Sequence, residues 1–184
     1  MPGRSPAGPL MHEHRLIERM LAVLERKLDA MGAEAEANTA FIDTAADFIR
    51  IYADRCHHGK EEDILFKRLA DKDLDDSLAQ AMADLISDHV HGRELTHRMV
   101  DANVRYTAGD PAALAEIDSA GRELIAFYPV HINKEDAHFF KPCLEYFSAE
   151  EKAQMLVDFD EFDRALIHER YRAIVERLEG EDSA

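Results

Sequence analysis

The stretch Cys56-His57-His58-Gly59-Lys60-Glu61-Glu62-Asp63-Ile64-Leu65-Phe66 places a histidine and a glutamate four residues apart twice, as His57/Glu61 and His58/Glu62. In a helix, residues four apart lie one turn above each other on one face, so an imidazole nitrogen and a carboxylate oxygen can reach the same metal ion. This stretch has the densest set of potential ligands in the chain of 184 residues. It therefore predicts a helix that carries a metal site.

A second copy of the pattern lies near the end of the predicted bundle, in Tyr128-Pro129-Val130-His131-Ile132-Asn133-Lys134-Glu135-Asp136-Ala137-His138-Phe139-Phe140. His131 and Glu135 have the same spacing, and a lysine precedes the glutamate in both copies. One such pair arises easily by chance on a surface helix. Two copies, each followed by a Leu-Phe or Phe-Phe pair, indicate two helices that face one centre.

Apolar residues recur at steps of three and four through most of the chain, which is the period of helices that pack in a bundle. No segment has the alternation of a strand. The pattern predicts an all-α protein, an up-and-down four-helix bundle with an additional C-terminal helix. We expect a flexible N-terminal lead (1–9), the bundle (10–147) and a last helix packed on or extending it (148–184).

Several boundaries carry a stop or start signal. The first helix should stop at Gly32, and the second should run from about Thr39 to Ala70. The acidic loop 71–76 should open the third helix, and Asp110-Pro111 the fourth, in which Pro129 should introduce a kink. A capping box, Ser148 with Glu151, should open the fifth, with the tail 180–184 frayed.

Each of the four bundle helices carries at least one histidine on its apolar stripe. In the second helix the stripe favours His57/Glu61 mildly over His58/Glu62, and in the third it selects His89. Polar groups at one level of a bundle core are costly unless they are paired or bind a metal. Imidazole and carboxylate without thiolate suit iron, manganese or zinc, and two glutamates from facing helices can bridge two ions. The predicted ligands are His14, His57, Glu61, His89, His131 and Glu135.

At these positions the chain resembles the hemerythrin-like proteins with an HHE cation-binding domain, which are carboxylate-bridged di-iron four-helix bundles. The resemblance covers about residues 10–147. It implies two non-haem iron ions, with His57 and Glu61 as ligands and His58 and Glu62 as their neighbours. It rests on Glu13-His14-Arg15, on His57 to Phe66, on Asp88-His89 and on His131 to Asp136.

Two departures from that pattern bear on the predicted function. The oxygen-carrying members have a third-helix His-x-x-x-His, whereas Arg93 stands four residues after His89. In place of their last-helix aspartate, Glu135 supplies the second bridge. The pattern is closer to di-iron proteins linked to iron-sulfur cluster repair and nitric oxide, and to iron-sensing domains, than to a pure carrier.

A substitute for the missing imidazole could be His138, on the stripe of Glu135, or His168 in the fifth helix. His138 is the better candidate, although it could also be a hydrogen-bonded residue at the end of the bundle, and His168 could be a surface residue. Glu62 and Lys60 are read as solvated groups or as supports for the ligands. Tyr128 is read either as a core residue or as a hydrogen-bond donor to a ligand of the centre.

Composition excludes several classes of function. With 22 basic and 38 acidic residues, the formal charge of −16 argues against nucleic acid or an anionic membrane as partner. Cys56 and Cys143 are far apart and are expected to be reduced, buried thiols. No apolar run approaches the roughly 20 residues of a membrane span, and the N-terminus lacks the apolar core of a signal peptide. We therefore expect a soluble, cytoplasmic protein.

The expected function is a non-haem di-iron protein that binds or reduces a small ligand: dioxygen, peroxide or nitric oxide. The alternative is an iron- or oxygen-sensing or iron-storage protein that acts through a partner protein without turnover. A catalyst would also need an electron donor. The sequence does not choose between these functions, and it leaves zinc or manganese open as the metal.

Overall fold

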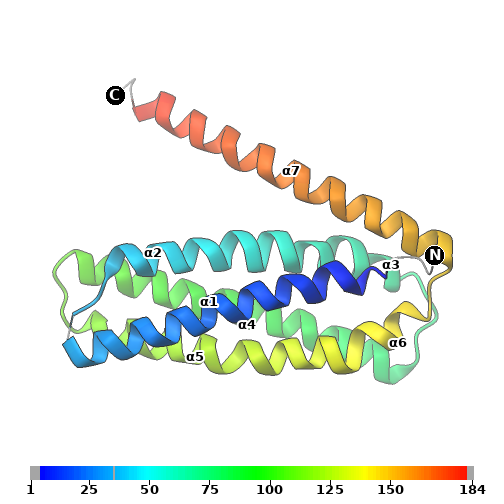
Figure 1. The fold of residues 1–184 in the computed structure, drawn as a ribbon, viewed down its shortest axis with the longest axis horizontal. Coiled ribbons are helices and arrows are strands. Elements are labelled where there is room, and N and C mark those ends of the chain that lie inside the picture. The colour runs from blue at the N-terminus through cyan, green and yellow to red at the C-terminus, as the bar shows by residue number, and fades with distance from the viewer. Residues whose placement is uncertain (1–4, 35, 182–184) are drawn as a thin grey trace.

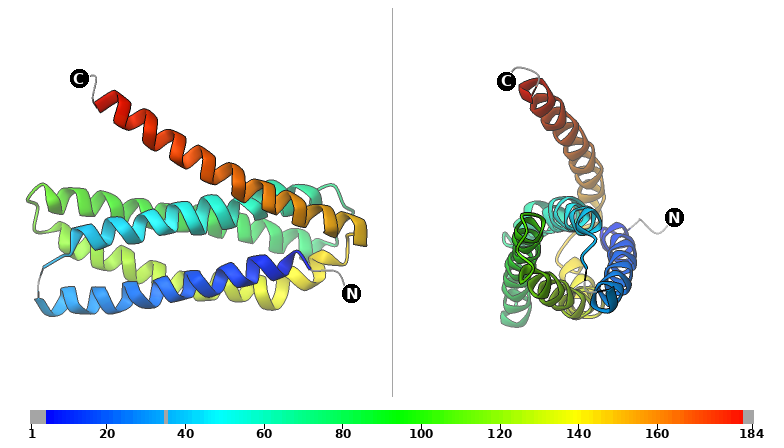
Figure 2. Two further views of the ribbon diagram at one scale, coloured as in Figure 1. Left: turned by 45° about the horizontal axis from the view of Figure 1, so that its top comes forward. Right: turned by 90° about the vertical axis from the view of Figure 1, so that its left-hand side faces the viewer.

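The computed structural model describes the backbone of residues 5–34 and 36–181, and the side chains of residues 5–33 and 36–166. All regular structure in these ranges is helical, which confirms the predicted fold class. Four long helical rods run up and down around one core, and a fifth follows them (Figures 1 and 2). The segments are α1 (Ala7–Glu34), α2 (Thr39–Phe48), η1 (Ile49–His58), η2 (Glu61–Phe66), α3 (Lys67–Leu69), α4 (Asp76–Thr107), α5 (Ala113–Asn133), η3 (Lys134–Phe139), α6 (Phe140–Leu144) and α7 (Ala149–Glu181).

The first helix is longer than predicted at both ends. It begins at Ala7 instead of Leu10 and continues past Gly32 to Glu34. Pro9 is tolerated because the first helical turn has no intrahelical acceptor for the N–H that proline lacks. The expected lead of residues 1–9 is therefore helical from Ala7 onward, while residues 1–4 lie outside the described part of the chain.

Two of the helix starts follow their capping signals, at Asp75 and at Ser148. Asp75 caps α4 by accepting a hydrogen bond from the backbone N–H of Leu78 at 2.9 Å. Ser148 and Glu151 form the predicted capping box, with reciprocal hydrogen bonds of 3.2 and 2.7 Å. The fourth helix begins at Ala113 and not at Pro111, because Asp110 caps the preceding turn instead. The helix then runs through Pro129 without interruption, and residues 182–184 of the predicted frayed tail lie outside the described residues.

Three π-helical segments, η1, η2 and η3, interrupt the second and fourth rods at the level of the histidine/glutamate pairs. A π turn hydrogen-bonds to the fifth residue back, so it holds more residues than an α turn, and such segments occur frequently at functional sites. The wider turn shifts the inward face of the helix. As a result His57 and His58 are both buried, although they are consecutive.

Two apolar clusters fill the bundle on either side of one polar level. The first contains Ile17, Ala53, Leu95 and Leu124, and the second contains Leu10, Leu65, Leu85 and Phe139 with the start of α7. The histidines and glutamates lie between these positions in sequence on every rod. They are therefore enclosed by packed hydrocarbon above and below.

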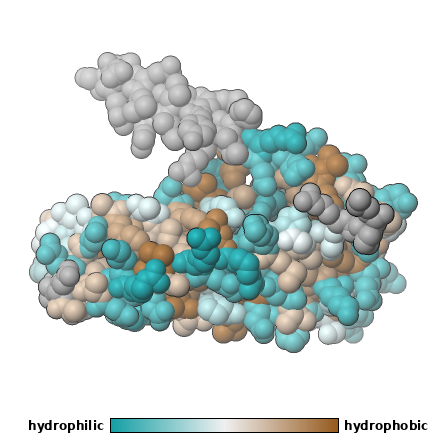
Figure 3. Space-filling model, in the orientation of Figure 1, coloured by the Kyte–Doolittle hydropathy of each residue, from teal (hydrophilic) through white to brown (hydrophobic). Residues whose placement is uncertain are grey.

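The first half of α7 packs on the second rod through buried Met155 and Phe159. Beyond that, α7 diverges from the bundle (Figures 1 and 2). The visible face of the bundle mixes hydrophilic residues with small apolar patches (Figure 3). None of the helices in the described ranges combines the length and the apolar character needed to cross a membrane.

Candidate metal centre

Seven ionisable side chains meet at the polar level of the core, each at most 1% exposed. They include all six ligands predicted from the sequence, and the seventh is His58. They form two groups, and within each group the potential ligand atoms lie within 4.8 Å of one another. The first group contains His14, His57, Glu61 and Glu135, and the second contains His58, His89 and His131.

Glu61 and Glu135 connect the two groups. Glu61 Oε1 lies 3.6 Å from His57 Nε2, while its Oε2 lies 3.4 Å from His89 Nε2. Glu135 Oε2 lies 3.1 Å from His14 Nε2, and its Oε1 lies 3.3 Å from His131 Nε2. Each carboxylate thus offers one oxygen to each group, which is the geometry of two bridging carboxylates.

Most of the donor atoms that face the centre lack a hydrogen-bond partner, and the exceptions are the Nε2 atoms of His14 and His57, which lie 2.8 Å from each other. All four carboxylate oxygens of Glu61 and Glu135, and the Nε2 atoms of His58, His89 and His131, are buried without a hydrogen bond in the described part of the chain. Buried polar groups in native proteins are otherwise almost always satisfied. Imidazole nitrogens and carboxylate oxygens left free together suit metal cations, so the residues present fit metal ions.

Burial sets the protonation of the imidazoles. It lowers the pKa of His14, lowers those of His57 and His58 well below the ordinary value, and lowers that of His131 to about 3. These rings are therefore neutral at physiological pH. A neutral imidazole keeps the lone pair that a metal requires.

Burial has the opposite effect on the carboxyl groups. It raises the pKa of Glu61 well above its ordinary value, and the charges of Glu13 and Glu62 add to the shift. The pKa of Glu135 is likewise raised, first by burial and then by the charge of Glu61. Two such carboxylates side by side are unstable as ions unless cations accompany them.

A second ring of carboxylates stands behind four of the imidazoles. The distances from Nδ1 are 2.8 Å for His14–Asp136, 3.0 Å for His57–Glu13, 2.7 Å for His89–Glu62 and 3.4 Å for His131–Asp88. A carboxylate that accepts from Nδ1 fixes the ring and leaves Nε2 to face the centre.

Glu13, Asp88 and Asp136 were missed as functional residues from the sequence. Each is the immediate neighbour of a ligand in its own helix, and it supports a ligand of another helix. An acidic residue directly beside a predicted ligand is the signal that could have found them.

The structure differs most from the sequence-based prediction at His58. The sequence favoured His58 as a neighbour of the ligands and His138 as the replacement for the missing imidazole. Instead, His58 lies in the second group, whereas the His138 side chain is exposed and belongs to neither group. The side chain of His168 lies outside the described residues. Arg93, where the oxygen carriers have a histidine, donates hydrogen bonds to Asp54 and to Glu62, each at 2.7 Å.

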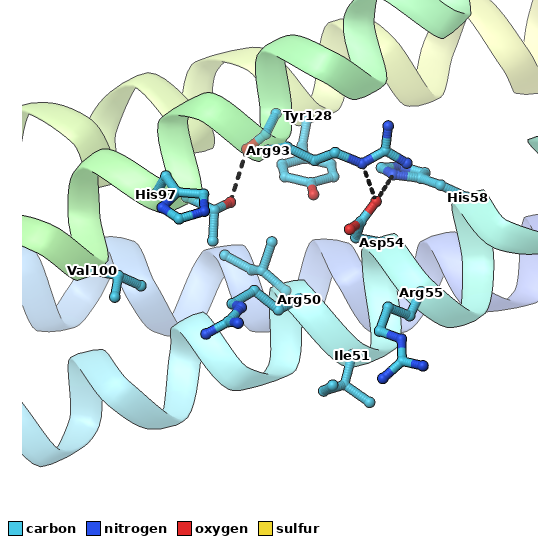
Figure 4. A pocket seen from close by; sticks show the side chains of 12 residues that line it. Arg50, Ile51, Asp54, Arg55, His58, Arg93, His97, Val100 and Tyr128 are labelled. Carbon is cyan, nitrogen blue, oxygen red and sulfur yellow. Dashed lines mark hydrogen bonds and ion pairs between the residues drawn. The ribbon is translucent and has the colours of Figure 1, made fainter. Parts of the chain in front are cut away.

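Tyr128 is a buried core residue at the same level, at 1% exposure. Its ring is parallel to that of His58, with the centroids 6.4 Å apart. Burial raises the pKa of its hydroxyl above the ordinary value. Its hydroxyl group is therefore protonated, and it lines a cavity beside His58 (Figure 4).

Lys60 is buried, which excludes the first of its two predicted roles, a solvated group, and leaves that of a supporting group. Its ammonium group contacts Glu13 and lies 2.9 Å from Asp163 Oδ1 on α7. Burial opposes its charge, but Glu13 together with Cys56 and Asp163 outweighs burial and raises the pKa. The neighbouring Cys56 is half-buried, Cys143 is buried, and both thiols are free with the pKa raised by burial to about 12.

The fold and the centre together define an all-α metal-binding bundle with two adjacent groups of ligands that share two carboxylates. The chain matches the Hemerythrin HHE cation binding domain over residues 6–143. It therefore belongs to the hemerythrin HHE family, as the sequence motifs indicated. Cation binding at the His/Glu level is the property this membership implies.

Relatives of the chain occur in mycobacteria. It is 24% identical over 170 residues to the uncharacterized proteins Rv1995 of Mycobacterium tuberculosis and Mb2018 of Mycobacterium bovis. The alignment covers 92% of this chain and 66% of each relative, so the chain spans just under two thirds of their length. No solved structure matches the chain at a significant level.

Proposed function

We propose that the protein holds two iron ions in a carboxylate-bridged, non-haem centre and there binds or reduces dioxygen, peroxide or nitric oxide. The observation that carries this proposal is the division of the oxygens of Glu61 and Glu135 between two histidine groups. Glutamates from facing helices bridge pairs of ions in other di-iron bundles. The donor set also suits manganese or zinc, and iron is proposed because HHE domains typically bind it.

Bound iron would supply the electron transfer and the affinity for such small ligands. The protein supplies an unequal set of donors. His14 and His57 with two carboxylate oxygens make four donors, whereas His58, His89 and His131 with two oxygens make five. For six-coordinate ions the first group leaves more room, so we propose that the small ligand is taken at the His14/His57 group.

The residues around that group keep water out and fix protonation. The ring of Phe140 stacks on His14 with the centroids 5.9 Å apart. Glu13 and Asp136 hold the Nδ1 protons of His57 and His14. An enclosed site with fixed imidazoles suits a small uncharged ligand, and a reductive reaction would draw electrons from a donor protein or molecule. Two free cysteines support a reducing compartment, the cytoplasm, as the location.

A sensing or storage role without turnover is the second candidate, and one observation favours it. His57 Nδ1 contacts Glu13, Glu13 contacts Lys60, and Lys60 contacts Asp163 on α7. A change at the centre can therefore reach the helix that extends from the bundle. A partner protein that reads the position of α7 would make the protein a sensor.

The test is elemental analysis of anaerobically purified protein, followed by titration of the oxidised protein with azide. We expect about two irons per chain and a visible absorption band that azide changes. A single tightly bound ion would contradict the di-iron proposal, whereas a spectrum indifferent to azide would contradict small-ligand binding and favour the sensing or storage role. A catalyst should turn over peroxide or nitric oxide when a reductant is supplied. A sensor should show no turnover, and the protease sensitivity of its α7 should depend on bound metal.

A further inference from the structure

A cavity of about 340 Å³ opens between the second rod and α4, on the outer side of the second histidine group (Figure 4). Its apolar lining includes Ile49, Ile51 and Val100, and its inner end is formed by His58 and Tyr128. Cavities that bind small organic molecules in proteins are about 300–1,000 Å³, whereas one water molecule occupies about 30 Å³ of the liquid. The cavity is therefore larger than a diatomic ligand requires.

The inner end of this cavity contains the one gap in the ring of supporting carboxylates. Four imidazoles have a carboxylate oxygen within 3.4 Å of Nδ1. His58 Nδ1 lies 3.6 Å from Asp54 Oδ1 and has no hydrogen bond in the described part of the chain. Asp54 Oδ1 already accepts from Arg93 Nε at 2.7 Å. His58 is 1% exposed, so a buried donor at the cavity wall lacks an acceptor.

The charge of the lining is opposite to that of the protein. Three arginines, Arg50, Arg55 and Arg93, and one acidic residue, Asp54, line the cavity in a chain with a formal charge of −16. Arg93 is paired with Asp54 and with Glu62 behind the lining, so the rim contributes the charge that a ligand meets. Arg50 and Arg55 are exposed at the rim. Clefts lined by one sign of charge raise the local concentration of ligands of the other sign. The lining therefore favours an anion.

We propose that this cavity binds a small organic carboxylate. Its carboxylate group accepts a hydrogen bond from His58 Nδ1–H, as the protein's own carboxylates do for the other four imidazoles, and Tyr128 O–H is a second donor. Its apolar part lies against Ile49 and Val100. An inorganic oxoanion would satisfy the donors but leave the apolar walls without a contact. The inference requires only the described lining residues and holds whichever small ligand the centre takes.

The test is isothermal titration calorimetry of the metal-loaded full chain with benzoate, benzamide and nitrite. Benzamide keeps the ring and removes the charge, and nitrite keeps the charge and removes the ring. We expect benzoate to bind with about 1:1 stoichiometry and at least about tenfold more tightly than either, a difference of about 1.4 kcal/mol. Comparable affinities for benzoate and benzamide, or binding of nitrite without benzoate, would overturn the proposal.

Substitutions of lining residues test whether benzoate binds in this cavity. Val100→Phe fills the cavity and should weaken benzoate binding at least about tenfold, and Arg50→Gln should weaken it about threefold through the lost rim charge. The matched control is Arg98→Gln, on α4 outside the cavity, which should leave the affinity unchanged. Benzoate binding that survives in both cavity variants would place the acid elsewhere. Because Arg50 is exposed, its variant decides the matter if Val100→Phe does not fold.

Discussion

The imidazole rings of His58 and His89 stack on each other, with centroids 3.9 Å apart and planes 10° from parallel. They come from the second rod and from α4, and both belong to the second histidine group. Two buried rings at this distance are tolerated because burial lowers the pKa of His58, so it is uncharged. His58 thereby supplies the fifth imidazole that position 93 does not.

If the centre holds the two proposed metal ions, replacing His58 should remove one of them. We expect His58→Ala to lower the metal content from about two ions per chain toward one, because the second group keeps only His89 and His131. His138→Ala is the control, and it should retain both ions because its side chain is exposed. Elemental analysis after dialysis measures both variants. The reverse result, loss in the His138 variant and none in the His58 variant, would show that the described centre is wrong.

Glu61 and Glu135, which connect the two histidine groups, should affect metal binding more strongly than Glu62 does. Glu61→Ala and Glu135→Ala should each lose both ions, because each removes an oxygen from both groups. Glu62 accepts from His89 Nδ1 and from Arg93 but faces no other ligand. Glu62→Ala should keep two ions with affinity reduced about 10–100-fold, the usual effect of removing a supporting carboxylate. Competition with a chelator measures the affinities, and loss of both ions in Glu62→Ala alone would reverse the assignment.

The sequence was sufficient for the fold because periodicity alone determines it. The apolar stripes that carry His14, His89 and His131, on three different helices, have an α-helical period. These residues meet at the polar level of the core, as predicted. His57 and Glu61 lie there as well. The capping residues Asp75 and Ser148 also act locally, and they were readable for that reason.

His58 and Lys60 could not be placed from the sequence for two physical reasons. A π-helical segment has no residue signature, so an α-helical stripe extended through η1 puts His58 off the inward face. Lys60 is buried only because Glu13 and Asp163 reach it from helices far away in the chain. The residues beside Lys60 in the sequence, Gly59 and Glu61, give no sign of those partners.

The metal-free protein should lose stability as the pH falls below neutrality. The folded-state pKa of His14, His57, His58 and His131 is lowered by burial, to about 3 for His131. The unfolded chain therefore binds more protons below about pH 6.5, and a fully shifted imidazole contributes a loss of at most about 1.4 kcal/mol per pH unit. Melting temperatures of chelator-treated protein between pH 7.5 and 5 measure this. A rise in melting temperature on acidification would contradict it.

The carboxyl groups oppose that trend, and one variant isolates their effect. The raised pKa of Glu61 gives stability that is present below about pH 4.5 and is lost as the pH rises through the folded-state value. Metal-free Glu61→Gln should therefore melt at a higher temperature than metal-free wild type at pH 7.5, and the difference should shrink toward pH 4.5. Equal melting at both pH values would mean that Glu61 carries no such cost.

Lys60 should contribute strongly to the stability of the bundle and to the position of α7. It is 1% exposed at its side chain and joins Glu13, which is 12% exposed, to Asp163. Lys60→Met leaves the Glu13 carboxylate without its cation in a largely buried position. Removal of one partner of a buried pair costs about 3–5 kcal/mol, and we expect about 3 kcal/mol because Asp163 is partly exposed.

The matched control is Lys72→Met, which also breaks an ion pair to α7. Lys72 Nζ lies 2.5 Å from Glu151 Oε1, and both side chains are more exposed, at 26% and 43%. An exposed pair of this kind contributes at most about 1 kcal/mol. Urea unfolding measures the free energies, and limited proteolysis reports the release of α7, which should occur in Lys60→Met and not in Lys72→Met. Equal free energies for the two variants would mean that the contacts of Lys60 do not hold α7 on the bundle. In that event the link from His57 through Glu13 could not carry a signal to α7, and the sensing role would lose its structural support.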